Sequence, residues 1–252
     1  MVKEKSGGAW YARGGSRVRE FYTIMHLPYT SMVLSYILIG AMFSPTIHLD
    51  RVVLTLVAYF FGLGFSAHAL NELHAAHWTE ALGRNELIAL FAVPLGGAVV
   101  VGVYGILELF AVSGSILPPL ILLAVILLEV FFLSAYNTDA FKGGFHSDVS
   151  FAFSWAALPT LLSYYVNALT ITLGACLVAL AMAATAGIEI NLSRWCKELR
   201  RRSPLSELLF ADGTQERMNT LELMARPEKA LKLIVVVVDM TAISLIAYRL
   251  LP

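Results

Sequence analysis

The sequence predicts an all-α protein, a polytopic membrane helix bundle with about seven transmembrane helices. Of its 252 residues, 58% are apolar and only 14% are charged, and the mean hydropathy is +0.72. Soluble domains carry about 25% charged residues and about 45–50% apolar ones. This composition therefore excludes an ordinary soluble enzyme, a disordered tail and a nucleic-acid-binding module.

Seven apolar segments are each close to the roughly 20 residues that a membrane-spanning helix requires. Backbone groups in lipid must be bonded within the segment, and the alternation of barrel strands is absent, so we expect helices. Asp50 and Arg51 separate the first two segments, and Asn167 marks the predicted hairpin between the fifth and the sixth. The expected helices cover residues 28–47, 52–69, 87–107, 118–136, 149–166, 168–188 and 233–251.

The distribution of basic residues predicts the orientation. If the N-terminus lies inside, all but two of the 18 Lys and Arg residues fall in inner segments, the exceptions being Arg51 and Arg249. Such a bias sets the topology of membrane proteins. We therefore predict an integral cell-membrane protein with a cytoplasmic N-terminus and an outside C-terminus. The predicted parts are a cytoplasmic N-terminal segment (1–27), a six-helix membrane bundle (28–190), a cytoplasmic basic loop (191–232) and a seventh helix (233–252).

The basic loop is the one part of the chain that looks soluble. Its run Arg200-Arg201-Arg202 predicts an interfacial segment against anionic lipid. Residues 206–225 are expected to form a short amphipathic helix. The two cysteines have neither the spacing nor the surroundings of a disulfide or a zinc site. No cleavable signal peptide is expected, because a charged region and a cleavage site are missing before the first apolar segment.

A first polar cluster lies at the predicted inner end of the second helix. It contains His68, Asn71, Glu72, His74 and His77. If the helix continues through this stretch, His68 and Glu72 lie one turn apart on the same face. His74 and His77 form a second pair at helical spacing.

A second polar cluster follows the fourth helix and contains Tyr136, Asn137, Asp139, Lys142 and His146. Under the predicted topology both clusters lie at the same membrane face, so we expect them to converge. Each residue alone could instead be a helix cap or an interfacial anchor. The two clusters together favour a functional site.

Two acids fall inside predicted spans. Glu129 lies about 10 Å, and Asp239 about 9 Å, from the inner ends of their helices at 1.5 Å per residue. An acid within a span usually faces a cavity or a partner. The similar depth predicts a polar inner cavity, whereas the alternative is a protonated carboxyl bonded to a neighbouring helix. Asp148 is a candidate N-cap of the fifth helix, and Gly143-Gly144 a candidate turn.

The residue types of these clusters suit a magnesium ion and a phosphate. Carboxylate and amide oxygens are the ligands of Mg²⁺, which often bridges to substrate phosphates. Basic side chains could neutralise the phosphate oxygens, and the candidates are Arg84, Lys142, Arg194 and Lys197. The six histidines would permit a redox metal, but their spacing lacks H-E-x-x-H or a dense set of histidine boxes.

The order of these features is similar to that of the UbiA superfamily of intramembrane prenyltransferases. Members of that family carry an acidic motif at the inner end of the second helix, where residues 64–74 lie here. They then carry a Tyr and a Lys between the fourth and fifth helices, where Tyr136 and Lys142 lie. A helix with a small-Trp and Pro pattern follows, here Trp155 and Pro159. The resemblance covers about six helices.

The resemblance implies a helical bundle with a central cavity, which binds a polyprenyl diphosphate through Mg²⁺ and transfers the prenyl group to a lipid or aromatic acceptor. It implies catalytic roles for Glu72, Asp139 and Lys142. The implied metal ligands are Glu72, Asp139, Asp148 and Glu189. The implied substrate contacts are His68, Asn71, Tyr136, Asn137, His146, Trp155, Arg194 and Lys197. Trp155, Tyr164 and Tyr165 are expected to stabilise an allylic cation.

Two other functions remain open from the sequence. A non-enzymatic protein on the same scaffold would bind a lipid, a quinone or a metal. Altered acidic motifs favour it, because His68-Ala69 stands where the family has an Asn-Asp pair. A small transporter would use Glu129 and Asp239 as ion sites, but no inverted repeat is present. A membrane lipid or polyprenyl diphosphate is the expected partner, no nucleic acid is expected, and the oligomeric state is open.

Overall fold

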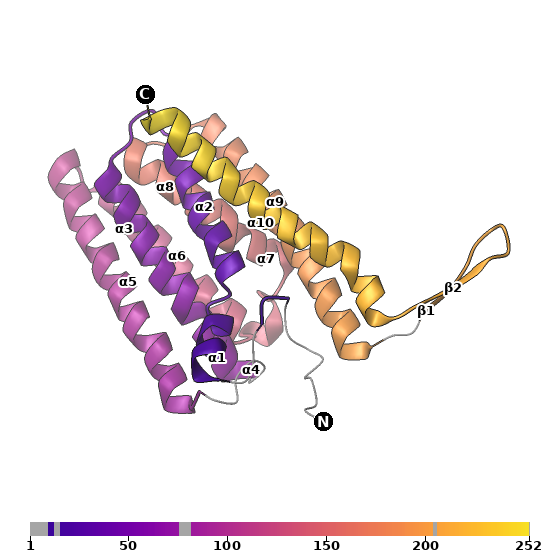
Figure 1. The fold of residues 1–252 in the computed structure, drawn as a ribbon. Helices are drawn as coiled ribbons and strands as arrows, with labels where there is room; N and C mark the ends of the chain where they lie inside the picture. Colours follow the sequence, from indigo (N-terminus) through magenta and orange to yellow (C-terminus); the bar gives the residue numbers. More distant parts are fainter. Residues whose placement is uncertain (1–9, 13–15, 76–81, 204–205, 252) are drawn as a thin grey trace.

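The computed structural model describes residues 10–12, 16–75, 82–203 and 206–251, and they form a bundle of long helices (Figure 1). Within these residues, seven helical spans are long and apolar enough to cross a membrane. Successive spans alternate in direction, so the bundle has α1 at one end and the last turn of α10 at the other. The predicted bundle and its number of spans are confirmed, and a short two-stranded hairpin is the exception to the all-α prediction.

The first five spans agree with the predicted segments to within a few residues, apart from α1, which precedes the first. The first span is α1 (Arg17–Ile24) with α2 (Leu27–Phe43), and the second is α3 (Leu49–Tyr59), the π-helical η1 (Phe60–Ala67) and α4 (His68–Ala75). The third and fourth are α5 (Arg84–Ser113) and α6 (Leu117–Asn137). The fifth is α7 (Asp148–Ala152), the π-helical η3 (Phe153–Ala157) and α8 (Leu158–Ala168).

The last two spans are longer than predicted. The sixth, α9, covers Leu173–Arg202, and the seventh, α10, covers Thr220–Leu250. The prediction ended the sixth helix and began the seventh where charged residues occur. A helix bonds its own backbone, however, so it can continue past the hydrocarbon layer and carry charges there. Asn219 fixes the start of α10, because its side chain accepts from two amides of the first turn.

The predicted amphipathic helix over residues 206–225 is wrong. Strands β1 (Ser206–Leu209) and β2 (Gln215–Met218) pair antiparallel instead, and the hairpin projects away from the bundle (Figure 1). The turn explains this, because Gly213 has a φ of +81° and Asp212 accepts hydrogen bonds from Thr214. Those bonds hold the pKa of the Asp212 carboxyl below its usual range.

The core lies around α2, which packs between α8 and α10. Tyr36 and Ile37 of α2 are almost fully buried. Gly40 permits the close approach to α8, because a Cβ there would lie 2.2 Å from the carbonyl oxygen of Thr160. Large apolar side chains of α5 point outward by contrast, and Val93 is 73% exposed. An apolar outer surface of this kind fits contact with lipid.

The bundle has two distinct ends. The polar end holds the last turns of α4 and α6 and the start of α7, with His74, Asn137 and Asp148. The opposite end holds the last turns of α2, α5 and α8, with Phe43 and Ser113. The described parts of all segments that were predicted to face inward lie at the polar end. The alternation of the spans requires this.

Both π-helical segments are next to predicted site residues, since η1 ends directly before His68 and η3 contains Trp155. Pro159 has no N–H to bond the carbonyl of Trp155, which accounts for the wide turn of η3. In η1, the hydroxyl of Ser66 donates to the carbonyl of Phe61, five residues earlier. Such segments often occur at functional sites.

Candidate functional site

His68 lies at the polar end inside a group of aromatic rings. Its ring is 7% exposed, stacks on the ring of His26 at 4.2 Å and lies 5.3 Å from Trp155. Its Nε2 has no hydrogen-bond partner within the described residues. The hydroxyl of Tyr11 lies 2.8 Å from Nδ1 of His26. Burial raises the pKa of Tyr11 well above its usual value, so this phenol keeps its proton.

The ring group continues toward the α6–α7 connection. Trp155 stacks on Phe151 at 5.2 Å, and Phe151 lies 5.8 Å from Tyr136. Tyr136 in turn stacks on His146 at 4.5 Å with an angle of 11° between the rings. The two clusters predicted from the sequence therefore meet, because aromatic contacts link His68 to His146.

Charged side chains of the polar end form two separate groups, one around Asp139 and one around Asp148. Nδ1 of His146 lies 2.8 Å from one carboxyl oxygen of Asp139, and Nε2 of His74 lies 3.7 Å from the other. Asp148 forms an ion pair of 2.7 Å with Arg194. The predicted N-cap role of Asp148 is wrong, because the hydroxyl of Ser147 accepts the amide hydrogen bond that caps α7.

Two further acids are buried nearby. Glu72 on α4 is 2% exposed and Glu189 on α9 is 4% exposed. Both carboxyl groups are thus held inside the bundle at this end.

Other predicted site residues do not join the group. The amide of Asn137 donates to the carbonyl of Leu133 in its own helix. Lys142 and Lys197 are exposed, and Asn71 is half-buried. Lys142 lies in a turn of left-handed backbone, next to the confirmed Gly143-Gly144 turn.

Two aromatic residues that were expected near a prenyl cation lie at the opposite end. The Tyr164 hydroxyl lies 3.2 Å from that of Thr172, and the Tyr165 hydroxyl donates to the carbonyl of Pro118. Both phenols therefore contact residues near the connections between spans at that end. His77, with the rest of residues 76–81, lies outside the described residues.

The magnesium ion that the resemblance implies does not fit this arrangement. Within the described residues, no three His, Cys, Asp or Glu side chains gather so that they could hold a metal ion. Asp139 is paired with His146, and Asp148 with Arg194. No chemical step is therefore assigned to Mg²⁺.

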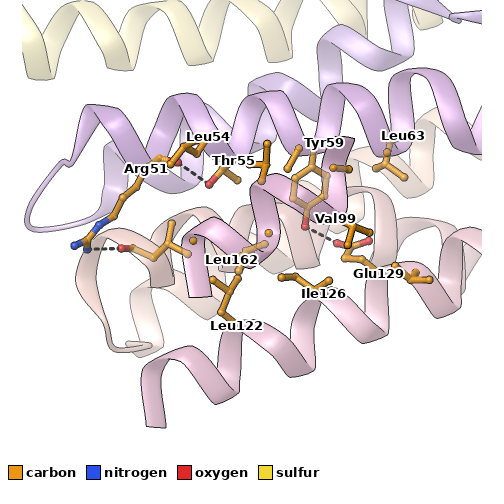
Figure 2. A pocket seen from close by; sticks show the side chains of 18 of the residues that line it. Arg51, Leu54, Thr55, Tyr59, Leu63, Val99, Leu122, Ile126, Glu129 and Leu162 are labelled. Carbon is orange, nitrogen blue, oxygen red and sulfur yellow. Dashed lines mark hydrogen bonds between the residues drawn. The ribbon is translucent and has the colours of Figure 1, made fainter. Parts of the chain in front are cut away.

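A second candidate site lies deeper in the bundle, between α3, η1, α5, α6 and α8. It is a pocket of about 120 Å³ with an almost entirely apolar wall (Figure 2). It extends along the second span from Arg51 to Leu63, which is about 18 Å at 1.5 Å per residue. Small residues of α5 provide the space, and Ala98, Gly102 and Gly105 recur on one helix face.

Two acids line this pocket, Glu108 near its far end and Glu129 among aliphatic side chains. One carboxyl oxygen of Glu129 accepts a hydrogen bond of 2.5 Å from the hydroxyl of Tyr59 (Figure 2). Asp239, by contrast, accepts hydrogen bonds from Ser31 and Ser35 of α2 and does not line the pocket. The predicted polar cavity that both acids share is therefore wrong, and Asp239 takes the alternative of bonding to a neighbouring helix.

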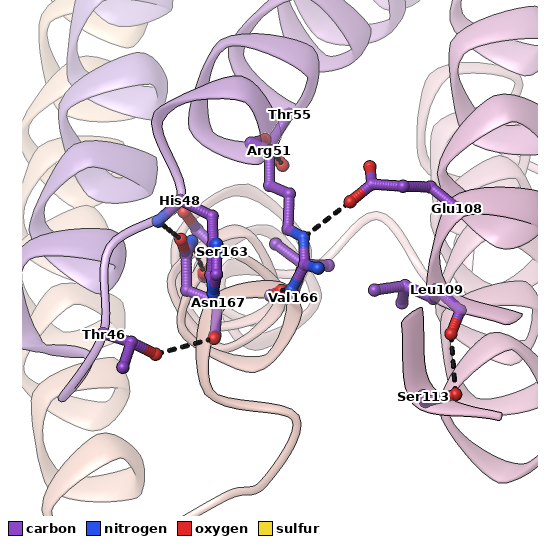
Figure 3. Close-up of polar contacts among 10 residues, drawn as sticks. All are labelled: Thr46, His48, Arg51, Thr55, Glu108, Leu109, Ser113, Ser163, Val166 and Asn167. Carbon is purple, nitrogen blue, oxygen red and sulfur yellow. Dashed lines mark hydrogen bonds and ion pairs between the residues drawn. The ribbon is translucent and has the colours of Figure 1, made fainter. Parts of the chain in front are cut away.

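An ion pair closes the pocket at the opposite end. Nε of Arg51 donates to Glu108 at 2.8 Å, and Nη1 donates to the carbonyl of Val166 (Figure 3). Arg51 is 8% exposed. The side-chain oxygen of Asn167 accepts a hydrogen bond from the amide of His48 and so holds the loop between α2 and α3. Asn167 lies in the last turn of α8, which ends at Ala168, and Leu169 takes the left-handed turn toward α9, so Asn167 marks the connection as predicted.

No protein-family model, curated protein or solved structure matches this chain. The function is therefore inferred from the residues and the geometry of this chain alone. Sequence reasoning missed the pocket, although the small residues at positions 98, 102 and 105 were a signal for it. Tyr59 and Glu108 gave weaker signals, because each is a single polar residue in an apolar run.

Proposed function

We propose that this protein binds a long apolar lipid chain, such as an isoprenoid, inside its membrane-spanning part. The observation that carries the proposal is the pocket between α3, η1, α5, α6 and α8. The residues of the second span that line it extend over about 18 Å. Apolar cavities exclude water and accept apolar guests, and the volume of about 120 Å³ takes a segment of a hydrocarbon chain whose remainder lies in the bilayer. Function as a lipid- or quinone-binding protein was one of the alternatives left open by the sequence.

The position of the pocket also supports a lipid as its occupant. Val99 lines the pocket and is 42% exposed on the outer surface of α5. A ligand dissolved in the bilayer could therefore enter from the side without crossing water. The ion pair of Arg51 with Glu108 closes the pocket toward the opposite end.

The test is photolabelling of the full-length protein in lipid nanodiscs with a photoreactive methyl ether of geranylgeraniol. Gly105→Leu places a side chain in the pocket, and a Cβ fits there because its nearest neighbour is 3.4 Å away. Gly96→Leu on the same helix is the matched control, since Gly96 is exposed and has open space around it. We expect labelling to fall about tenfold in Gly105→Leu and to stay unchanged in Gly96→Leu. Equal labelling of the two variants would contradict the proposal.

Prenyl transfer at the polar end is the second candidate function. It is supported by the ring contacts that bring His68, Trp155, Tyr136 and His146 together from separate elements. The paired acids do not favour it, because they do not form a metal site within the described residues.

The second candidate is tested with geranylgeranyl diphosphate and Mg²⁺, with mass spectrometry of the lipid products. If transfer occurs and needs the buried acid of α4, Glu72→Gln lowers turnover at least about tenfold. Glu216→Gln, on the exposed hairpin, is the control and keeps full turnover. Tight binding of the prenyl chain without any turnover supports the lipid-binding function alone.

A further inference from the structure

The pocket contains three ionisable side chains of the acidic and basic types, and two of them neutralise each other. Arg51 and Glu108 form an ion pair at the opposite end, and the guanidinium also donates to the carbonyl of Val166. These groups are therefore engaged with the protein. Glu129 is the remaining acidic side chain among the described residues that line the pocket.

The carboxyl group of Glu129 has one oxygen free for a ligand. Its Oε1 accepts the hydrogen bond from Tyr59, and its second oxygen has no hydrogen bond within the described residues. The neighbouring wall is formed by Ile126, Val130 and Leu133, which offer no polar group. A carboxyl oxygen in such surroundings is an acceptor that lacks a donor, and an unpaired polar group is costly in an apolar region.

The position of Glu129 limits the kind of donor. It lies eight residues from the end of α6 at Asn137, about 12 Å deep at 1.5 Å per residue. A phosphate, a carboxylate or an ammonium would have to lose its hydration at this depth, which is costly for a charged group. A hydroxyl group is neutral, and it donates one hydrogen bond to the free oxygen.

We propose that Glu129, hydrogen-bonded to Tyr59, binds the hydroxyl group of a neutral long-chain lipid alcohol whose hydrocarbon chain occupies the pocket. The inference rests on the proposed lipid-binding function and adds to it the chemical class of the ligand. Tyr59 donates to one carboxyl oxygen and leaves the other for the ligand, and the carboxyl itself carries the preference.

The experiment compares two competitors for the photolabelling reaction, geranylgeraniol and its methyl ether, on the full-length protein in nanodiscs. The two compounds share a chain and differ in the hydroxyl donor. We expect the wild-type protein to prefer the alcohol by about tenfold, the contribution of one hydrogen bond.

Variants locate the preference. Glu129→Leu should bind both compounds equally, with its affinity for the methyl ether unchanged. Glu129→Gln keeps an acceptor oxygen and should retain part of the preference, and Tyr59→Phe should retain it because the carboxyl remains. Asp239→Asn is the matched control, a second acid within a span that does not line the pocket, and should keep the full preference.

Two results would overturn the inference. One is a wild-type protein that binds the alcohol and the methyl ether equally, and the other is a Glu129→Leu variant that keeps the preference. In both cases the proposed lipid-binding function stands, because the methyl ether still binds. If neither compound competes, and Gly105→Leu changes nothing, then lipid binding in the pocket is itself refuted.

Discussion

The ion pair at the opposite end of the pocket gives the sharpest test of the packing. Arg51 is 8% exposed and Glu108 18%, so both charges are largely removed from water. Removing one partner of a buried pair leaves an uncompensated charge and costs about 3–5 kcal/mol. We expect Glu108→Leu to lower the free energy of unfolding by about 3 kcal/mol, the low end of this range. The loss is limited because the carbonyl of Val166 still accepts a hydrogen bond from Arg51. We expect Arg51→Leu to lower the free energy of unfolding by about 2 kcal/mol, because the carboxyl of Glu108, which is the more exposed partner, can take up a proton.

The double variant distinguishes a buried pair from two independent contacts. With both charges replaced by Leu, the loss should shrink to within about 1 kcal/mol of the wild type, because an apolar pair fills the same space. The assay is reversible unfolding of the detergent-solubilised protein in a denaturant titration. Glu207→Gln serves as control, because its pair with Arg217 is exposed and contributes about 0–1 kcal/mol. Additive losses near 5 kcal/mol in the double variant would refute the reasoning.

The remaining predictions concern the helix crossing and the orientation. Gly40→Ala should destabilise the protein by about 3 kcal/mol, because its Cβ would lie 2.2 Å from the carbonyl oxygen of Thr160 and the two helices must separate. Gly62→Ala, with open space around its Cβ, should change the unfolding free energy by less than about 1 kcal/mol, and unfolding of both variants in detergent decides. The orientation can be tested in a cysteine-free background with a membrane-impermeant maleimide applied to intact cells. The reagent should label the Ser115→Cys variant and leave the Asp212→Cys variant unlabelled. The reverse labelling pattern would invert the predicted topology.

The number of spans could be predicted from the sequence, but the ends of the last two could not. Hydropathy reports where lipid can surround a helix, and Val93 on α5 shows the outward apolar surface that results. It does not report where a helix stops. The extensions of α9 and α10 carry charges into water, and the start of α10 is fixed by the cap at Asn219. A cap is a local hydrogen-bond pattern, and here it follows a hairpin whose Gly213 turn was also missed.

The convergence of polar residues could be predicted because it depends on topology alone. Alternating spans bring His68 and His146 to one end whatever the details of packing, and a series of ring contacts at that end links them. Their pairing could not be predicted. Whether Asp139 meets a metal or a histidine depends on distances of about 1 Å between helices, which spacing along the chain does not determine.

Glu129 and Asp239 show why similar acids in similar sequence surroundings have different partners in the fold. Asp239 faces two serines of α2, which satisfy both of its oxygens. Glu129 faces one tyrosine and a wall of aliphatic side chains, which leaves an oxygen for a ligand. The sequence contains both acids but not their neighbours, because these come from residues that are about 70 to 200 positions away.

The distance between the two candidate sites decides whether their functions can coexist. Glu129 precedes Tyr136 by seven residues of α6, so the two lie about 10 Å apart along the helix. One lipid cannot place its head group at both positions while its chain fills the same pocket. An alcohol bound at Glu129 should therefore inhibit any prenyl transfer at the polar end by competing for the chain site, and Glu129→Leu should relieve that inhibition. Inhibition that survives the substitution would separate the pocket from the chemistry, and the polar end would then need a chain site of its own.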